Sequence, residues 1–260
     1  MKNALLLIAL LSLVTVGCDK DDDSKPATSS NLTVTFKATF DGVELEKQKD
    51  FMYGSYPVHF DRYTQYISDL ALVKSDGSEV KLSEVEFLEF FPDFNSGNLS
   101  ATPQRTYANV PLGDYTGLKI GVGVRTDLNA KKPSDFPAGT PLALENEYWL
   151  SWKSYIFSKI EAKAELDGTG NDYETFLNYH SGSATSRDIY KAFSYTIPIS
   201  VTGPADAMTL ELDMKKLFTG PTGKLLDLNV PENQYTGTTP TDLGVAEFLR
   251  DNWPNALSVK

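Results

Sequence analysis

The chain is dominated by short segments in which apolar and polar residues alternate with period two. This alternation is typical of a strand with one buried face, whereas the apolar residues of a helix recur every three to four positions. Asp41-Gly42 and Asp76-Gly77 supply turn dipeptides between such segments. Together they predict an all-β fold, an antiparallel β-sandwich or barrel. The clearest alternating segments are Leu32–Phe40, Tyr63–Val73, Leu118–Val124, Thr175–His180 and Met208–Met214.

The C-terminal third of the chain gives two further predictions. Phe193–Val201 is expected to pair with Met208–Met214 across Gly203-Pro204, and Pro198 places the first segment at a sheet edge. A short C-terminal helix should follow. We expect Thr241 or Asp242 to cap it and Pro254 to end it.

The most aromatic stretch is Asn146–Ala162, which holds two of the three tryptophans, Trp149 and Trp152. Its large rings would each contribute about 1.5–3 kcal/mol when buried, so the stretch belongs to the core. The spacing of its apolar residues fits a helix and a strand about equally. We expect Tyr148–Trp152 to be a turn of helix or an irregular lead-in, and Tyr155–Leu166 to be a central strand.

The N-terminus has the composition of a leader. Residues 1–17 begin with Met1-Lys2 and continue with an apolar run of signal-peptide length. Gly17-Cys18 resembles a bacterial lipobox, in which Cys18 is acylated and becomes the mature N-terminus. Residues 18–31 are predicted to be a lipidated acidic tether, and residues 32–260 one β domain.

Charge and cysteine usage limit the partners. The formal net charge is −11, so nucleic acid and anionic lipid surfaces are poor partners, and we expect no nucleic-acid binding. The expected membrane link is therefore the acyl chains on Cys18. The acidic run after it resembles the export signal of Bacteroidetes lipoproteins, which predicts a lipid-anchored protein exposed at the outer-membrane surface. Cys18 is the only cysteine, so a disulfide within the chain is excluded.

The sequence offers few parts for catalysis. It has two histidines, no Gly-x-Ser-x-Gly and no His-Glu-x-x-His, so serine- and zinc-hydrolase mechanisms lack their residues. Gly121 and Gly123 lack the third glycine of a dinucleotide site, and the Asp167–Asp172 turn lacks the acidic spacing of a calcium loop. We predict that the protein is not an enzyme.

Soft and borderline metal ligands remain. These are the imidazoles of His59 and His180 and the thioethers of Met52, Met208 and Met214. Imidazole and thioether suit copper better than magnesium or calcium. A lone histidine at a strand end is more often a surface or core residue, and a methionine in a strand is usually core filler.

Several segments, in this order, resemble the MbnP-like family of copper-binding periplasmic proteins and Bacteroidetes lipoproteins. The resemblance spans most of the chain after residue 31. It is carried by Tyr66–Leu72, Leu118–Val124, Pro141–Ala143, Tyr148–Trp152 with Tyr155–Glu161, Phe176–His180, Leu212–Phe218 and Arg250–Ala256.

The resemblance implies a β-sandwich that binds copper. In the best-known members, histidines act together with a tryptophan that a dihaem, peroxidase-like partner has oxidised to kynurenine. Trp149 and Trp152 match the tryptophan-rich segment of the family, and His180 matches its Tyr-His or Phe-His. The metal residues that this implies are His180, His59, Trp149 and Trp152.

Two functions stay open. A copper-binding or copper-scavenging surface lipoprotein requires His59 and His180 close in space beside an indole. A surface glycan- or protein-binding module would instead present exposed aromatic residues from Phe87–Phe94 or Tyr53–Tyr63 as a platform, with the histidines far apart.

Overall fold

The computed structural model describes residues 28–91, 102–170, 172–184, 187–203, 205–236 and 242–260. Cys18, the leader and most of the predicted tether lie outside these residues. Within them, no helix is both long enough and apolar enough to cross a membrane.

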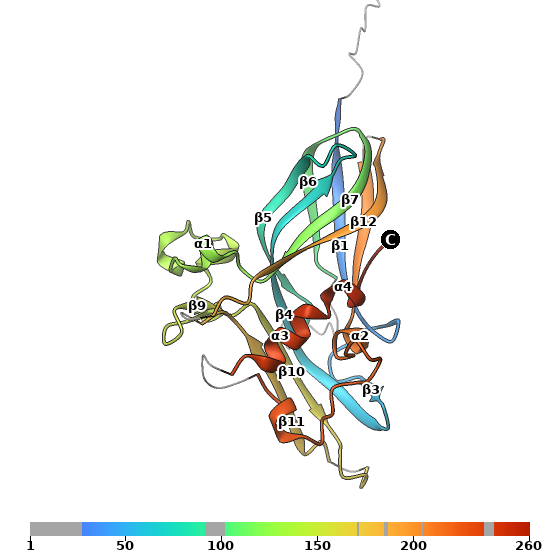
Figure 1. The fold of residues 1–260 in the computed structure, drawn as a ribbon, viewed down its shortest axis with the longest axis vertical. Coiled ribbons are helices and arrows are strands. Elements are labelled where there is room, and N and C mark those ends of the chain that lie inside the picture. The colour runs from blue at the N-terminus through green and yellow to red at the C-terminus, as the bar shows by residue number, and fades with distance from the viewer. Residues whose placement is uncertain (1–27, 92–101, 171, 185–186, 204, 237–241) are drawn as a thin grey trace, which may run out of the picture.

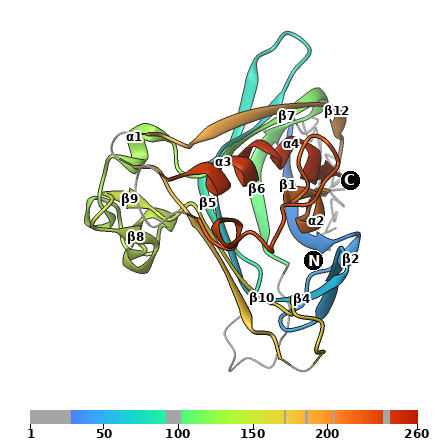
Figure 2. The same cartoon turned by 60° about the horizontal axis from the view of Figure 1, so that its bottom comes forward.

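Two sheets contain nearly all the strands of the described residues (Figures 1 and 2). The first has the order β14-β13-β1-β2, and β6 also pairs with β1. Its strands are β1 (Ser29–Phe40), β2 (Val43–Glu44), β6 (Gln104–Pro111), β13 (Ala205–Asp213) and β14 (Leu257–Val259). The second has the order β11-β10-β4-β7-β12, and β3 and β5 also pair with β4. Its strands are β3 (Asp50–Tyr53), β4 (Tyr56–Val73), β5 (Glu79–Glu89), β7 (Gly113–Val122), β10 (Ser158–Ala164), β11 (Thr175–Ser181) and β12 (Lys191–Val201).

The alternation in the sequence becomes the core between the sheets. In β1, Leu32, Val34 and Phe36 are at most 3% exposed, and the threonines between them point away. They belong to one apolar cluster with Ile67 of β4 and Leu118 of β7, from the opposite sheet. The predicted all-β sandwich is confirmed.

The predicted pairing of the last long strands is wrong. β12 pairs with β7 in the second sheet, whereas β13 pairs with β1 in the first. The β1–β13 pair is moreover parallel, with Asn31 opposite Ala205 and Thr39 opposite Asp213, so the sandwich is mixed rather than purely antiparallel. Alternation reports which side chains are buried but not which strand is the partner. β12 does lie at a sheet edge, and its register shifts around Pro198.

The C-terminal helix is interrupted. α3 (Gly244–Asp251) is followed by α4 (Trp253–Ala256), and a one-turn helix, α2 (Met214–Leu217), lies near them. Pro254 stands in the first turn of α4, where proline is tolerated, instead of ending a helix. The residue before α3 is Leu243, without a side-chain cap, so Asp242 does not cap it; Thr241 lies outside the described residues.

A lateral lobe covers part of the second sheet. It contains α1 (Thr126–Asn129), the short 3-10 turns Pro133–Asp135, Pro141–Ala143 and Glu145–Glu147, and the small hairpin β8 (Tyr148–Trp149)–β9 (Ser154–Tyr155). A second apolar cluster, which includes Tyr66, Leu142 and Tyr155, supports the lobe. Tyr148–Trp152 is therefore a strand and turn rather than helix, and the following central strand is shorter than predicted, Ser158–Ala164.

Candidate functional site: an indole pocket beside His180

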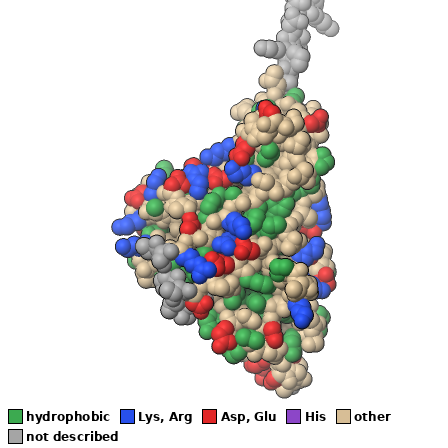
Figure 3. All heavy atoms as spheres, in the orientation of Figure 1, with side chains coloured by type: hydrophobic (Ala, Val, Ile, Leu, Met, Phe, Trp, Pro, Cys, Tyr) green, Lys and Arg blue, Asp and Glu red, His purple; other side chains and the backbone are tan. Residues whose placement is uncertain are grey.

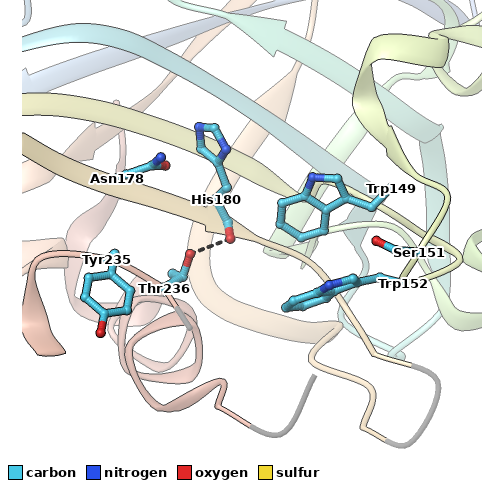
Figure 4. A pocket seen from close by; sticks show the side chains of 7 residues that line it. All are labelled: Trp149, Ser151, Trp152, Asn178, His180, Tyr235 and Thr236. Atoms are coloured by element: carbon cyan, nitrogen blue, oxygen red, sulfur yellow. Dashed lines mark hydrogen bonds between the residues drawn. The ribbon is translucent and has the colours of Figure 1, made fainter. Parts of the chain in front are cut away.

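An open pocket of about 330 Å³ lies between the lobe and the edge strand β11. We call it the indole pocket. Figure 4 shows the two tryptophans on one side, Tyr235, Thr236 and Asn178 on the other, and His180 between them. Its lining residues are Trp149, Ser151, Trp152, Asn178, His180, Tyr235 and Thr236.

The two indoles are brought together by the β8–β9 hairpin. Trp149 lies opposite Ser154, and Trp152 stands in the turn between the strands. Their ring centroids are 4.7 Å apart, with the planes inclined by 52°. The buried Asn129 holds the outgoing arm, because its Oδ1 accepts a 2.8 Å hydrogen bond from the backbone N–H of Tyr155.

The opposite wall is a segment added to the edge of β11. The backbone N–H of Asn178 donates to the carbonyl of Gln234 at 2.9 Å, and that of Thr236 donates to the carbonyl of Asn178 at 3.0 Å. The Thr236 hydroxyl donates to the His180 carbonyl (Figure 4). These bonds hold Tyr235, which is 39% exposed, at the pocket.

Gly182 determines how closely Trp149 approaches β11. A Cβ at this position would lie 2.7 Å from the carbonyl oxygen of Tyr155 and 3.2 Å from the Trp149 ring. The first distance is shorter than real Cβ contacts, so a side chain here would push the hairpin away. Glycine is required for close approach and not for its backbone angles.

A carboxylate fixes the ring of His180. The strand β10 places Glu161 on the same outer face, and the His180 Nε2–Glu161 Oε1 distance is 2.9 Å. Arg62 of β4 contacts the same oxygen at 3.3 Å. The hydrogen bond from His180 is the main cause that lowers the pKa of Glu161 below its usual 4.5, and the Arg62 charge adds to it. Because an ionised carboxylate only accepts, Nε2 carries the proton and Nδ1 of a neutral ring keeps its lone pair.

His59 is not part of this pocket. It lies opposite Lys163 on β10, whereas His180 lies opposite Lys159, so β10 separates the two histidines by four residues along the strand. This register places them roughly 16 Å apart, whereas a shared ion needs about 2 Å to each nitrogen. The ring of His59 instead packs on Tyr173 at 4.1 Å, and its Nδ1 is 3.7 Å from Asp50.

The methionines add no thioether to the indole pocket. Met208 and Met214 are buried in the core between the sheets, and Met52 is exposed on β3. Among the described residues, one group of three could hold a metal through carboxylates, Glu165, Asp167 and Glu174, at the β10–β11 loop. All three accept backbone N–H bonds from their own loop. Acidic side chains gather at the lower tip in Figure 3.

Most of the aromatic residues expected to form the platform of the alternative function are buried. Phe90, Phe91, Tyr53 and Tyr63 are at most 5% exposed and belong to the core, and Phe94 lies outside the described residues. Phe87 and Tyr56 are half-buried, Phe176 of β11 is 70% exposed, and the aromatic residues of the indole pocket are also partly exposed. Nε2 of His180 and Nδ1 of His59 each face a carboxylate.

Sequence reasoning found Trp149, Trp152 and His180 but missed four partners. Glu161 and Asn178 look like ordinary exposed strand residues, and only the register of β10 with β11, which sets them opposite each other, reveals them. Tyr235 follows a Pro-Glu-Asn-Gln loop without any periodicity. For Gly182, the Ser-Gly-Ser context was a signal for a loop but not for an indole contact.

Comparison with known proteins agrees with this architecture. No curated protein matches the chain. MbnP from Methylosinus trichosporium shares the fold, with a TM-score of 0.53 and 17% sequence identity over 74% of this chain and 78% of that one. The family model for MbnP matches residues 29–238, a span that begins with β1 and includes every residue lining the indole pocket. On that match, which covers most of its length, the chain belongs to the MbnP family.

Proposed function

We propose that this protein is a lipid-anchored surface protein that binds copper in the indole pocket, with His180 as the nitrogen ligand. The observation that carries the proposal is the Glu161–His180 contact. Histidines that bind metals commonly donate their other ring N–H to a carboxylate, which fixes the tautomer and makes the free nitrogen more basic. Family membership and the neighbouring indoles support the same assignment.

The residues fit a site with one imidazole and do not fit a site with two. Imidazole is a good copper ligand, and no other histidine or thioether of the described residues lines the pocket. A site with a single protein nitrogen should hold copper more weakly than a site with two. His59 is accordingly not assigned to the metal.

Copper titration of purified protein tests the assignment. We expect wild type to bind one Cu(II), with one coordinated imidazole nitrogen detected by electron paramagnetic resonance. His180→Ala should lose the ion, and His59→Ala, the matched control, should retain it. Unchanged binding by His180→Ala, or loss on His59→Ala, would contradict the proposed ligand.

The anchor and the maturation partner are part of this proposal. Cys18 and the acidic run lie before β1, which begins at Ser29, so the tether would connect the lipid directly to a central strand. Mass spectrometry of the mature N-terminus tests acylation, and protease treatment of intact cells tests surface exposure. A mass change in the peptide that contains Trp149 and Trp152 would test oxidation by a dihaem, peroxidase-like partner.

A second candidate is a glycan-binding module, and the size of the indole pocket favours it. The pocket is much larger than one ion, and its two indoles, Tyr235 and the Asn178 amide are the mixture of aromatic and polar groups found in small-ligand sites. Calorimetry with defined oligosaccharides separates the candidates. Glycan binding predicts loss on Trp149→Ala with binding retained in His180→Ala, the reverse of the dependence on His180 that copper requires.

A further inference from the structure

Lys159 is a buried cation that the copper proposal does not use. It lies on β10, opposite Thr64 of β4 and His180 of β11, and the residue is only 7% exposed. It is on the outer face of the second sheet, where a lysine would ordinarily extend into water. The lateral lobe covers it instead.

The ammonium group contacts the incoming arm of the indole hairpin. Nζ donates to the carbonyl of Asn146 at 3.0 Å and to Oε1 of Glu147 at 2.9 Å. The β8 strand with Trp149 begins at the next residue, Tyr148. The backbone of Glu147 is itself tied to the outgoing arm, because its carbonyl accepts a 2.8 Å bond from Ile156.

Stability alone does not explain this ion pair. Its side chains are 8% and 13% exposed, and Oε2 of Glu147 is buried without a hydrogen-bond partner among the described residues. A buried pair with an unpaired oxygen is costly, and apolar residues of similar size often stabilise a protein as well or better. The pair instead fixes the orientation of the incoming arm of the hairpin relative to β10, since hydrogen bonds are directional and apolar contacts are not.

We propose that Lys159 is the positioning residue of the indole pocket: its bonds to Asn146 and Glu147 hold the β8–β9 hairpin so that Trp149 and Trp152 face His180. Lys159 sits directly beside His180 on the neighbouring strand, so the same β10 backbone sets the position of the imidazole and of the hairpin. The Asn129–Tyr155 bond holds the other arm. Removing the Lys159 contact frees one arm only, so the hairpin would swing and not unfold.

The experiment compares Lys159→Met with Lys163→Met. Lys163 is the matched control, because it lies on the same strand and face, four residues further along, and contacts Phe176 and not the hairpin. Acrylamide quenching of tryptophan fluorescence reports indole accessibility without any ligand. Trp253 is 4% exposed and contributes a constant background.

We expect the quenching constant of Lys159→Met to rise about twofold through local opening, at temperatures well below unfolding, with no change for Lys163→Met. Should Lys159→Met fail to fold, Glu147→Ala cuts the same contact from the other side and should give the same rise. Unchanged quenching in a folded variant of either residue would overturn the inference.

The consequence for binding rests on the proposed function and is measured separately. With Cu(II) as the probe, Lys159→Met should weaken binding about tenfold, and Lys163→Met should not. If wild type binds no copper, the proposed function fails while the quenching result still decides the role of Lys159. If copper binds but quenching and affinity are unchanged in Lys159→Met, the positioning role alone fails.

Discussion

Substitution of Gly182 by alanine tests how the indole pocket is built. The new methyl group would lie 2.7 Å from a backbone oxygen of Tyr155, so the β9 backbone has to move by several tenths of an ångström. It would also lie 3.2 Å from the Trp149 ring and 3.3 Å from the Ser154 hydroxyl, so neither can absorb the shift. Overpacking of this kind costs about 1–3 kcal/mol. For a chain of this length, that lowers the melting temperature by roughly 2–10 °C.

The assay is thermal and denaturant unfolding, together with the near-ultraviolet circular dichroism of the coupled indoles. We expect Gly182→Ala to lose free energy of unfolding and to change the indole signal in the folded state. Gly244→Ala is the control, because a Cβ there meets no atom within 4 Å and the residue begins α3. It should be neutral or slightly stabilising. A Gly182→Ala protein with the stability and indole spectrum of wild type would refute the close-approach argument.

Two further predictions concern single side chains elsewhere. The pKa of Glu161 lies below 4.5 in the folded protein, so the carboxylate stabilises the fold above pH 4.5 and this contribution is lost as the pH falls through the lowered pKa. Glu161→Gln should therefore make the free energy of unfolding fall less steeply at acid pH. An unchanged fall would contradict this prediction. Tyr63 is fully buried and stacks on Phe90 at 4.5 Å, and its hydroxyl has no partner among the described residues. Tyr63→Phe should therefore raise the free energy of unfolding, measured by denaturant titration, by about 1 kcal/mol. A loss of that size would instead reveal an unseen partner of the hydroxyl.

The local alternation of apolar and polar residues predicted where the strands lie. It could not predict which strands pair or in what register. Leu32–Phe40 and Thr175–His180 became β1 and β11 nearly as expected, because burial of one face dictates alternation. The partner of each strand depends on contacts far along the chain, which is why the sequence pattern predicted the wrong partner for β13. The two histidines are a case of the same kind. Both lie on the outer face beside β10, and only the count of residues along that strand shows that they are separate.

The site was predictable to the extent that it lies in one compact stretch. Trp149 and Trp152 are near in sequence and share a hairpin, so their proximity was local information. Glu161 and Lys159 reach the pocket or its base from β10, and Tyr235 does so from the segment that pairs with β11. The burial of Lys159 in particular contradicts the ordinary preference of lysine for water, and no pattern of neighbouring residues indicates it.

The parallel pairing of β1 with β13 also governs the order in which this protein can assemble. β1 lies at the beginning of the domain and can pair only after β13, near its end, has been made. Thr209 of β13 in turn exchanges backbone hydrogen bonds with Lys260. Contacts between such distant segments make folding slow, because a long loop closes before any are gained. A nascent chain would therefore lack the central strand pair of its first sheet until β13 has been synthesised, so that sheet can close only late in synthesis.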